Sequence, residues 1–300
     1  MDALPTLAIT VGDPAGIGPE VASKAVRDPR VLAVCEPRLY GPAKPEDVEP
    51  YPAGVVSAIS GLRSYEEVVR AVEDALRGAV DGIVTAPINK AAFAAAGFPW
   101  KGHTDLIAHL CGVPEAGMMF WSEKLRVVLA TVHIPLSEVP AALTKDKLCA
   151  IIRMTAAAMP RFGYPSPRIA VTGLNPHAGE DGLLGSEELI TVRPAIDACV
   201  KDGITVSGPF PADTVFVRAA RGDFDVVVAC YHDQGLIPVK LLSFGHSVNV
   251  TLGVPIIRTS VDHGTAFDIA RRGIADPGSM VEAILLAARL AAATKAQDSP

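Results

Sequence analysis

Short apolar runs alternate with longer stretches of helical periodicity along almost the whole chain. Runs of this length that are mostly apolar predict strands buried in a sheet. These runs are 7–11, 82–85, 127–131, 169–172, 226–230, 248–252 and 256–259. Between these strands, helices are predicted by apolar residues at helical spacing or by residues that commonly begin helices. These stretches are 19–27, 65–76, 89–96, 104–110, 145–162, 186–202 and 278–293.

The alternation of strands and helices predicts an α/β fold, in which mostly parallel sheets are covered by helices on both faces. With 300 residues, the chain is long enough for two α/β/α domains with a cleft between them. We expect residues 1–125 and 265–300 to form the first domain and residues 126–264 the second.

Composition and charge narrow the class of protein. Hydrophobic residues make up 49% and charged residues 20% of the chain, which is typical of a globular fold. A formal net charge of −6 argues against a nucleic-acid partner. We expect no membrane span, because the apolar stretch 280–294 is short and contains Glu282 and Arg289.

The termini and the cysteines predict a cytoplasmic protein. The first residues lack the basic and long apolar regions of a signal peptide. The five cysteines are scattered and contain no Cys-x-x-Cys pair, a pattern that favours reduced thiols. They are Cys35, Cys111, Cys149, Cys199 and Cys230.

Three of the seven histidines follow predicted strands. His133 comes after the run 127–131, His177 after 169–172 and His232 after 226–230. Loops at the carboxyl ends of parallel strands converge, so we expect these imidazoles to approach one another. Imidazole suits zinc, cobalt, nickel and iron, and three ligands leave a position for substrate or water. The spacing contains no short metal motif, so an ordinary hydrogen-bonding role for each histidine stays open.

Two further groups of residues are candidates for binding an anion. Lys240, Asn249 and Arg258 follow the third histidine, and such side chains bind carboxylate or phosphate. His103 and Thr104 begin a predicted helix, whose N–H groups favour an anion. Solvated surface residues and an ordinary helix cap are the alternative interpretations.

The glycine-rich segment 12–20 differs from the Rossmann fingerprint. It contains Gly16 and Gly18, but the position of the third glycine is Val21. If the protein binds a dinucleotide, a motif other than the Rossmann fingerprint would therefore bind it.

Seven phrases together resemble one family. They are ITVGDPAGIGPE (9–20), TAPINK (85–90), GHT (102–104), GLNPHAGE (173–180), PADT (211–214), YHDQG (231–235) and RTSVDHGT (258–265). The chain resembles the 4-hydroxythreonine-4-phosphate dehydrogenases from about residue 7 to residue 290. The segment 263–277 is also similar to the NAD loop of isopropylmalate and isocitrate dehydrogenases, which lack a Rossmann fingerprint. The resemblance implies their two-domain fold.

The resemblance also implies roles for individual residues. The metal ligands are His133, His177 and His232, the last completing the site of the other subunit in a homodimer. The substrate-binding residues are His103, Thr104, Lys240, Asn249 and Arg258. The cofactor-binding residues are His263, Gly264, Thr265 and Asp268. The candidate catalytic residues are Asp233, Asp213 and Lys240, the two carboxylates because they could orient a ligating histidine or accept a proton.

The implied reaction is metal-dependent oxidation of a phosphorylated 3-hydroxy acid by NAD or NADP. The expected substrate is 4-hydroxythreonine 4-phosphate, whose keto product loses carbon dioxide in pyridoxine biosynthesis, and the expected metal is zinc, cobalt or magnesium. The alternatives within the family are D-threonate or D-erythronate 4-phosphate and aromatic cis-dihydrodiols, and segment 41–62 looks shorter than in the biosynthetic enzyme. A non-enzymatic binding protein of two α/β domains is the alternative from another class.

Overall fold

The computed structural model describes residues 4–298, and the side chains of residues 4–295. The chain divides into two compact units, residues 1–116 with 248–300 and residues 117–247. The sequence pattern predicts boundaries after residues 125 and 264, whereas the structure divides the chain after 116 and 247. Strand pairing explains the difference, because 117–121 pairs with 126–129 in one unit and 248–252 pairs with 258–260 in the other.

The first unit contains a sheet of five strands in the order β2-β1-β3-β10-β9. The strands are β1 (Thr6–Thr10), β2 (Glu36–Tyr40), β3 (Gly82–Thr85), β9 (Val248–Leu252) and β10 (Arg258–Ser260). All neighbours in this sheet are parallel except β9 and β10. The mostly parallel sheet predicted for this part of the chain is confirmed.

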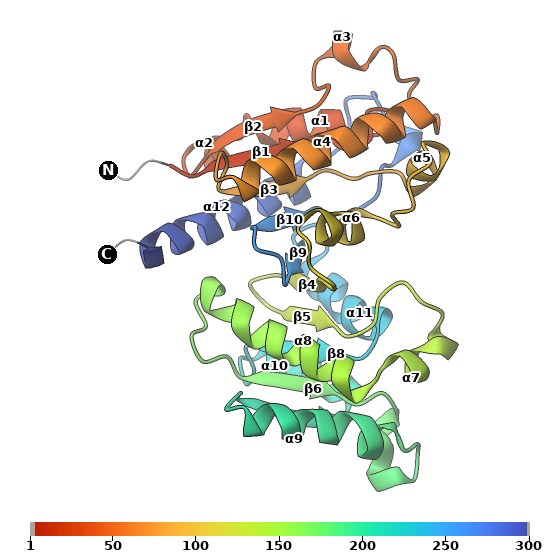
Figure 1. Cartoon of the computed structure of the whole chain (residues 1–300), viewed down its shortest axis with the longest axis vertical. Coiled ribbons are helices and arrows are strands. Elements are labelled where there is room, and N and C mark those ends of the chain that lie inside the picture. Colours follow the sequence, from red (N-terminus) through yellow and green to blue (C-terminus); the bar gives the residue numbers. More distant parts are fainter. Residues whose placement is uncertain (1–3, 299–300) are drawn as a thin grey trace. The chain divides into compact units, whose positions relative to one another are not determined.

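Helices cover the sheet of the first unit. They are α1 (Gly18–Ala25), α2 (Pro29–Leu32), α3 (Pro45–Val48), α4 (Ala58–Leu76), α5 (Lys90–Ala95), α6 (His103–Leu110) and α12 (Gly278–Asp298), with a 3-10 turn at Phe267–Ile269. Helix α4 packs on β1 and β3 together with α5 and α6, where Phe93 and Leu106 are fully buried. Helix α12 contacts β3, β9 and β10 (Figure 1).

The second unit has the same layered design. Its strands are β4 (Gly117–Trp121), β5 (Arg126–Leu129), β6 (Ile169–Thr172), β7 (Val206–Phe210) and β8 (Val226–Ala229). They follow the order β4-β5-β8-β6-β7, in which only β4 and β5 are antiparallel. Strands β5, β8 and β6 are therefore adjacent and parallel, and their carboxyl ends lie at one edge.

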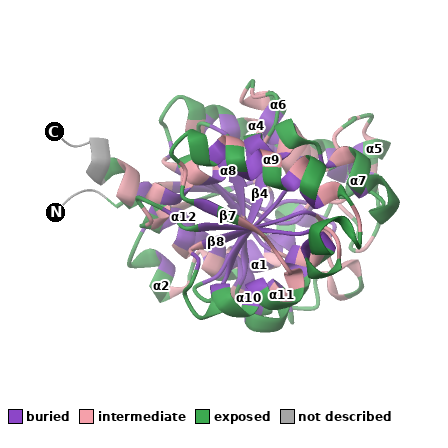
Figure 2. Cartoon of the chain, turned by 90° about the horizontal axis from the view of Figure 1, so that it is seen from below, coloured by how far each residue is buried: buried purple, intermediate pink, exposed green. Residues whose placement is uncertain are grey.

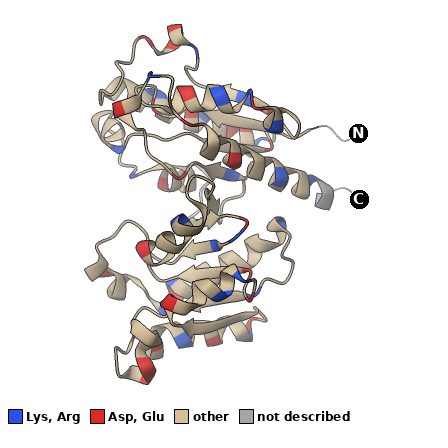
Figure 3. Ribbon diagram, turned by 180° about the vertical axis from the view of Figure 1, so that it is seen from behind, with Lys and Arg blue, Asp and Glu red and all other residues tan. Residues whose placement is uncertain are grey.

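Helices flank this second sheet on both faces. They are α7 (Val139–Ala142), α8 (Lys145–Ala158), α9 (Arg193–Lys201), α10 (Ala212–Ala220) and α11 (His232–Ser243). Figure 2 shows α8 and α9 on one side of the buried strands and α10 and α11 on the other. The shorter turns are Leu136–Glu138, Met159–Phe162, Pro176–Gly182 and Glu188–Val192. Charged residues of both signs are scattered over each unit (Figure 3).

Several elements differ from the sequence-based expectation. The pattern does not indicate β2, β4, β7, α10 or α11, and the stretch predicted as one helix over 186–202 is a π-helical turn followed by α9. Helix α11 contains Gly235 and Pro238, both poor helix formers. Within the described residues, no helix has the length and apolar character needed to cross a membrane.

Gly235 lets α11 pack closely on the strands beneath it. A Cβ added there would lie 2.7 Å from Leu129 Cδ2 and 2.8 Å from Val127 Cγ1. These distances are shorter than real Cβ contacts allow, so a larger residue would push the helix away from β5. Since α11 begins at His232, this contact also helps to place that histidine.

We expect Gly235→Ala to lower the free energy of unfolding by about 1–2 kcal/mol. Overpacking costs about 1–3 kcal/mol, and the better helix propensity of alanine offsets up to about 1 kcal/mol. Urea denaturation measures the effect. The control is Gly264→Ala, where an added Cβ meets no atom within 4 Å. A stability equal to wild type in Gly235→Ala would contradict the packing account.

Candidate functional site

The three histidines predicted as metal ligands all follow neighbouring strands of the second unit. His133 comes after β5, His177 after β6 and His232 after β8, and these strands are adjacent and parallel. The ring centroids of His133 and His232 are 5.5 Å apart, with an angle of 42° between the planes. The structure therefore brings two of the three imidazoles together within one chain.

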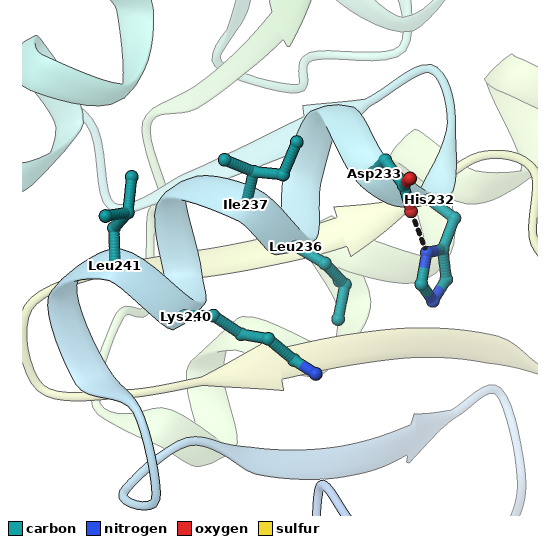
Figure 4. A pocket seen from close by; sticks show the side chains of 6 residues that line it. All are labelled: His232, Asp233, Leu236, Ile237, Lys240 and Leu241. Atoms are coloured by element: carbon teal, nitrogen blue, oxygen red, sulfur yellow. Dashed lines mark hydrogen bonds and ion pairs between the residues drawn. The ribbon is translucent and has the colours of Figure 1, made fainter.

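His232 is held by its neighbour in the first turn of α11. Its Nδ1 lies 2.7 Å from Asp233 Oδ1, and the side chain is 37% exposed. When a carboxylate accepts a hydrogen bond from Nδ1–H, the proton stays on Nδ1 and Nε2 keeps a free lone pair, the form in which imidazole binds a metal. Figure 4 shows the two side chains at the start of the helix, with the contact drawn between them. The orienting role expected for Asp233 fits this geometry.

His177 lies in an unusual left-handed turn. Five consecutive residues from His177 to Asp181 have φ between 45° and 80°. Only Gly179 among them is a glycine, and left-handed backbone costs other residues roughly 1–2 kcal/mol each. The imidazole is exposed, and its Nδ1 lies 3.3 Å from Glu180 Oε1. His133 also has a positive φ of 50°. Two candidate ligands thus lie on strained backbone, which is common at functional sites.

A buried carboxylate stabilises the loop that carries His177. Glu188 is 1% exposed, and its Oε1 accepts hydrogen bonds from the backbone N–H groups of Leu174 and Asn175 at 2.8 and 2.7 Å. Its Oε2 accepts another from Asn175 Nδ2 at 3.0 Å. The sequence analysis missed this role, because the contacts span 13 and 14 residues and leave no local signal.

The donor set fits a divalent metal that prefers nitrogen. His133 and His232 supply two neighbouring imidazoles, which suit zinc or cobalt better than magnesium. Among the described residues of a single chain, no group of three or more His, Cys, Asp or Glu side chains is arranged to hold a metal. The three-histidine site therefore stays a prediction.

The residues predicted to bind an anion fall in both units. Arg258 lies at the start of β10 and is 2% exposed. Its guanidinium donates to Thr251 Oγ1 at 3.0 Å and to Thr85 Oγ1 at 2.7 Å, while its buried Nε has no hydrogen-bond partner. Burial lowers the pKa of Arg258 to about 9, so the group is still largely protonated at neutral pH.

Two other residues predicted to bind substrate also have an unpaired buried polar atom. His103 Nε2 and Asn249 Oδ1 are buried without a partner. Burial, and then the charge of Arg258, lower the pKa of His103 well below its usual value, so this imidazole is neutral. Buried polar groups in folded proteins are nearly always paired. Three unpaired atoms at positions expected to bind substrate therefore support a polar ligand.

The other residues predicted to bind substrate or act in catalysis lie on helices and are exposed or half-buried. Thr104 is half-buried in the first turn of α6, and Asp213 is exposed in the first turn of α10. Lys240 is exposed on α11 and lines a pocket with His232 and Asp233 (Figure 4).

The predicted cofactor-binding residues lie in one loop of the first unit. This loop contains His263, Gly264, Thr265 and Asp268. The carbonyl of Thr265 accepts a hydrogen bond from Ile17 N at 3.0 Å. A Cβ on Gly16 would lie 2.8 Å from the same oxygen, so only glycine allows this approach. The glycine-rich segment after β1 therefore supports the predicted cofactor loop.

These features define a two-unit α/β protein of the dehydrogenase type, with strand-end histidines and a glycine-rich loop that is not a Rossmann fingerprint. The chain belongs to the family of the pyridoxal phosphate biosynthetic protein PdxA, whose family model matches residues 19–287. The resemblance seen in the sequence is thereby confirmed, and with it the dehydrogenase class.

Relatives match over nearly their full length. The 4-hydroxythreonine-4-phosphate dehydrogenase of Desulforapulum autotrophicum is 44% identical, with 98% of each chain covered. The D-threonate 4-phosphate dehydrogenase of Cupriavidus necator is 42% identical, covering 97% of this chain and 98% of its own. The crystal structure of the 4-hydroxythreonine-4-phosphate dehydrogenase from Klebsiella pneumoniae has a TM-score of 0.86 at 40% identity, covering 97% and 99%.

More distant structures confirm the predicted fold class. A terephthalate 1,2-cis-dihydrodiol dehydrogenase from Burkholderia xenovorans has a TM-score of 0.68 at 30% identity, covering 95% of this chain and 98% of its own. An isocitrate dehydrogenase from Methylococcus capsulatus has a TM-score of 0.50 at 18% identity, covering 93% and 83%. The latter likeness concerns the fold alone.

We expect Glu188→Ala to lower the free energy of unfolding by about 2–4 kcal/mol, because two backbone N–H groups lose a charged acceptor. Urea denaturation followed by circular dichroism gives the value. The matched control is Glu187→Ala, which removes one hydrogen bond from Asn175 Nδ2 and should cost under about 1 kcal/mol. Equal losses in the two variants would show that Glu188 does not stabilise the loop.

Proposed function

We propose that this chain is a metal-dependent dehydrogenase that oxidises 4-hydroxythreonine 4-phosphate with NAD or NADP. The observation that carries the proposal is the placement of His133, His177 and His232 after three adjacent parallel strands in a chain of the PdxA family. Relatives named for this activity match nearly the whole chain. The reaction would serve pyridoxal phosphate biosynthesis.

Different residues of the chain would bind the metal, orient a metal ligand and bind the substrate. His133, His177 and His232 would hold a zinc, cobalt or magnesium ion, which when bound supplies Lewis-acid stabilisation of negative charge on oxygen. Asp233 keeps His232 in the tautomer that binds through Nε2. Arg258, His103, Thr104, Asn249 and Lys240 would bind the phosphate and carboxylate of the substrate.

The chemistry is the oxidation of a secondary alcohol. A bound nicotinamide would supply the hydride acceptor, and Asp233, Asp213 and Lys240 are the candidates to accept the hydroxyl proton. The resulting 3-keto acid loses carbon dioxide, which leaves an amino-ketone phosphate. His263, Gly264, Thr265 and Asp268 would bind the dinucleotide, supported by the close contact between Gly16 and Thr265.

A homodimer with a shared metal site is part of the proposal. Helix α11 begins with His232, and two of its large apolar residues are strongly exposed, Ile237 at 60% and Leu241 at 80%. Phe244, directly after the helix, is 79% exposed. In Figure 4, Ile237 and Leu241 project from the same side of the helix. Exposed apolar side chains that gather on one side of a helix favour a contact with another protein. A second copy of this chain, related by a two-fold axis, would cover it.

Cytoplasmic location is a further part of the proposal. All five cysteines are free thiols, and reduced thiols are the rule in that compartment.

A second candidate substrate is D-threonate 4-phosphate, because a relative with that name is 42% identical. It carries the same phosphate and carboxylate, so the anion-binding residues do not distinguish the two. A cis-dihydrodiol is disfavoured by the lower identity of the dihydrodiol dehydrogenase, at 30%. The test is NAD and NADP reduction with each of these three substrates, in the presence of Zn²⁺, Co²⁺ or Mg²⁺. Fastest turnover of the dihydrodiol would overturn the proposal.

Metal binding gives a prediction that mixed dimers can check. We propose that His133 and His177 act with His232 of the partner subunit. Each single His→Ala variant should then stay folded but lose bound metal and activity. A mixture of His133→Ala with His232→Ala should recover activity, because one of the two sites in a mixed dimer has all three ligands.

A second mixture of variants tests which histidine is contributed by the partner subunit. His133→Ala with His177→Ala should stay inactive, because every site then lacks a ligand. Recovery in this mixture, without recovery in the first, would show instead that His133 and His232 act from the same chain, as their proximity within one chain allows. Subunit exchange is verified with two different affinity tags.

Arg258 gives a prediction on the substrate. Losing a charge-assisted hydrogen bond costs about 1.5–3 kcal/mol, or roughly 10- to 150-fold. We expect Arg258→Ala to lower kcat/KM for a phosphorylated substrate by at least this factor, and Arg258→Lys, which keeps the charge, to lower it less. Circular dichroism checks folding, because Arg258 also binds Thr85 and Thr251. Unchanged turnover of every phosphorylated substrate in Arg258→Ala would contradict the assignment.

A further inference from the structure

The side chain of Gln234 joins the ends of two neighbouring strands. Its Oε1 accepts hydrogen bonds from Thr172 Oγ1 at 2.7 Å and from the backbone N–H of Cys230 at 2.7 Å. Its Nε2 donates to the carbonyl of Gly173 at 2.7 Å. Thr172 is the last residue of β6, Gly173 follows it, and Cys230 follows β8. The side-chain amide of Gln234 therefore connects the carboxyl ends of β6 and β8.

A second contact extends the connection to a third strand. Thr131 Oγ1, which follows β5, donates to the carbonyl of Cys230 at 2.8 Å. Cys230, Thr172 and Thr131 are all buried, at 0–2% exposure. The hydrogen bonds thus run continuously from β5 through β8 to β6. Buried polar networks of this kind, when fully paired, define one backbone arrangement.

The connected strand ends are those that precede the three histidines. His133 lies two residues after Thr131, His232 two residues after Cys230, and His177 five residues after Thr172. His133 and His177 also have positive φ values of 50° and 53°. Such backbone persists only where the surrounding structure determines it. A network anchored directly before each loop meets this requirement.

We infer that Gln234 is a positioning residue for the metal centre: it holds the ends of β6 and β8 together so that the loops carrying His177 and His232 keep their binding geometry. This inference rests on the proposed metal site. Gln234 itself does not ligate the ion, because its Oε1 and Nε2 both form hydrogen bonds with residues at the strand ends. Its effect on the metal passes through the loop backbone.

The test compares three variants with wild type. Gln234→Leu keeps the size of the side chain and removes all three hydrogen bonds. Thr172→Val removes the hydroxyl that donates to Gln234, and Thr172→Ser is the conservative variant that keeps it. The control for loss of a buried hydrogen bond is Ser122→Ala, in the turn that precedes β5, where Ser122 Oγ bonds with Leu125 N and O at 3.0 Å.

Two readouts are used, neither of which requires turnover. Co²⁺ affinity is measured by titrating the visible absorption of the bound ion. Gln234→Leu should bind Co²⁺ about 10-fold more weakly or worse, as is typical for groups that orient ligands. Thr172→Val should show a smaller loss in the same direction, and Thr172→Ser and Ser122→Ala should match wild type. Hydrogen exchange of the metal-free proteins should rise at 174–182 only in Gln234→Leu and Thr172→Val.

The outcomes separate the inference from the proposed function. Absence of Co²⁺ binding by wild type would overturn the metal site, and the hydrogen exchange would still decide whether Gln234 holds the loops. Wild-type Co²⁺ affinity in Gln234→Leu, or exchange at 174–182 equal to that of wild type, would overturn the positioning role. An equal loss of affinity in Ser122→Ala would also overturn it, because general destabilisation would then explain the effect.

Discussion

The parallel pairing of β5, β8 and β6 is the constraint on which the candidate site depends. Parallel strands that are neighbours in one sheet must end at the same edge, so the residues that follow them are brought together whatever their separation in sequence. His133 and His232 are 99 residues apart in the chain, yet their rings lie 5.5 Å apart. Gly235 allows α11 to pack closely on β5, which places the start of the helix at this edge.

The loops at this edge contain strained backbone that other groups hold in place. The turn from His177 to Asp181 is left-handed throughout, and the buried carboxylate of Glu188 binds the residues just before it. A strained turn presents a side chain in one direction only, which suits a ligand whose geometry must be fixed before the metal arrives. The cost in stability is offset by charge-assisted hydrogen bonds inside the unit.

Much of the fold and part of the site could be predicted from the sequence. The buried strands 82–85 and 248–252 are short, mostly apolar segments, and the structure has them at the predicted positions. Strand β2 was missed because its sequence, EPRLY, is mostly exposed and contains proline. Helix α11 was missed because Gly235 and Pro238 interrupt its pattern. The position of His133 and His232 at strand ends was predictable, because it needs only the order of the strands.

The supporting contacts could not be predicted, for a physical reason. Gln234 and Glu188 act through hydrogen bonds to backbone groups far away in the sequence, and these partners depend on the folded chain rather than on local pattern. The unpaired atoms of Arg258, His103 and Asn249 likewise become visible only once burial is known. Residue types at strand ends therefore predict the class of site. The contacts that fix the loops of the site are seen only in the folded structure.

The most direct test of the central claim is X-ray absorption spectroscopy of the zinc-loaded protein. The account predicts scattering from three imidazole rings, with zinc–nitrogen distances of about 2.0–2.2 Å. The same measurement on His177→Ala should show loss of the bound zinc. A wild-type spectrum without imidazole scattering, or one unchanged in His177→Ala, would contradict the claim that the three strand-end histidines form a metal site.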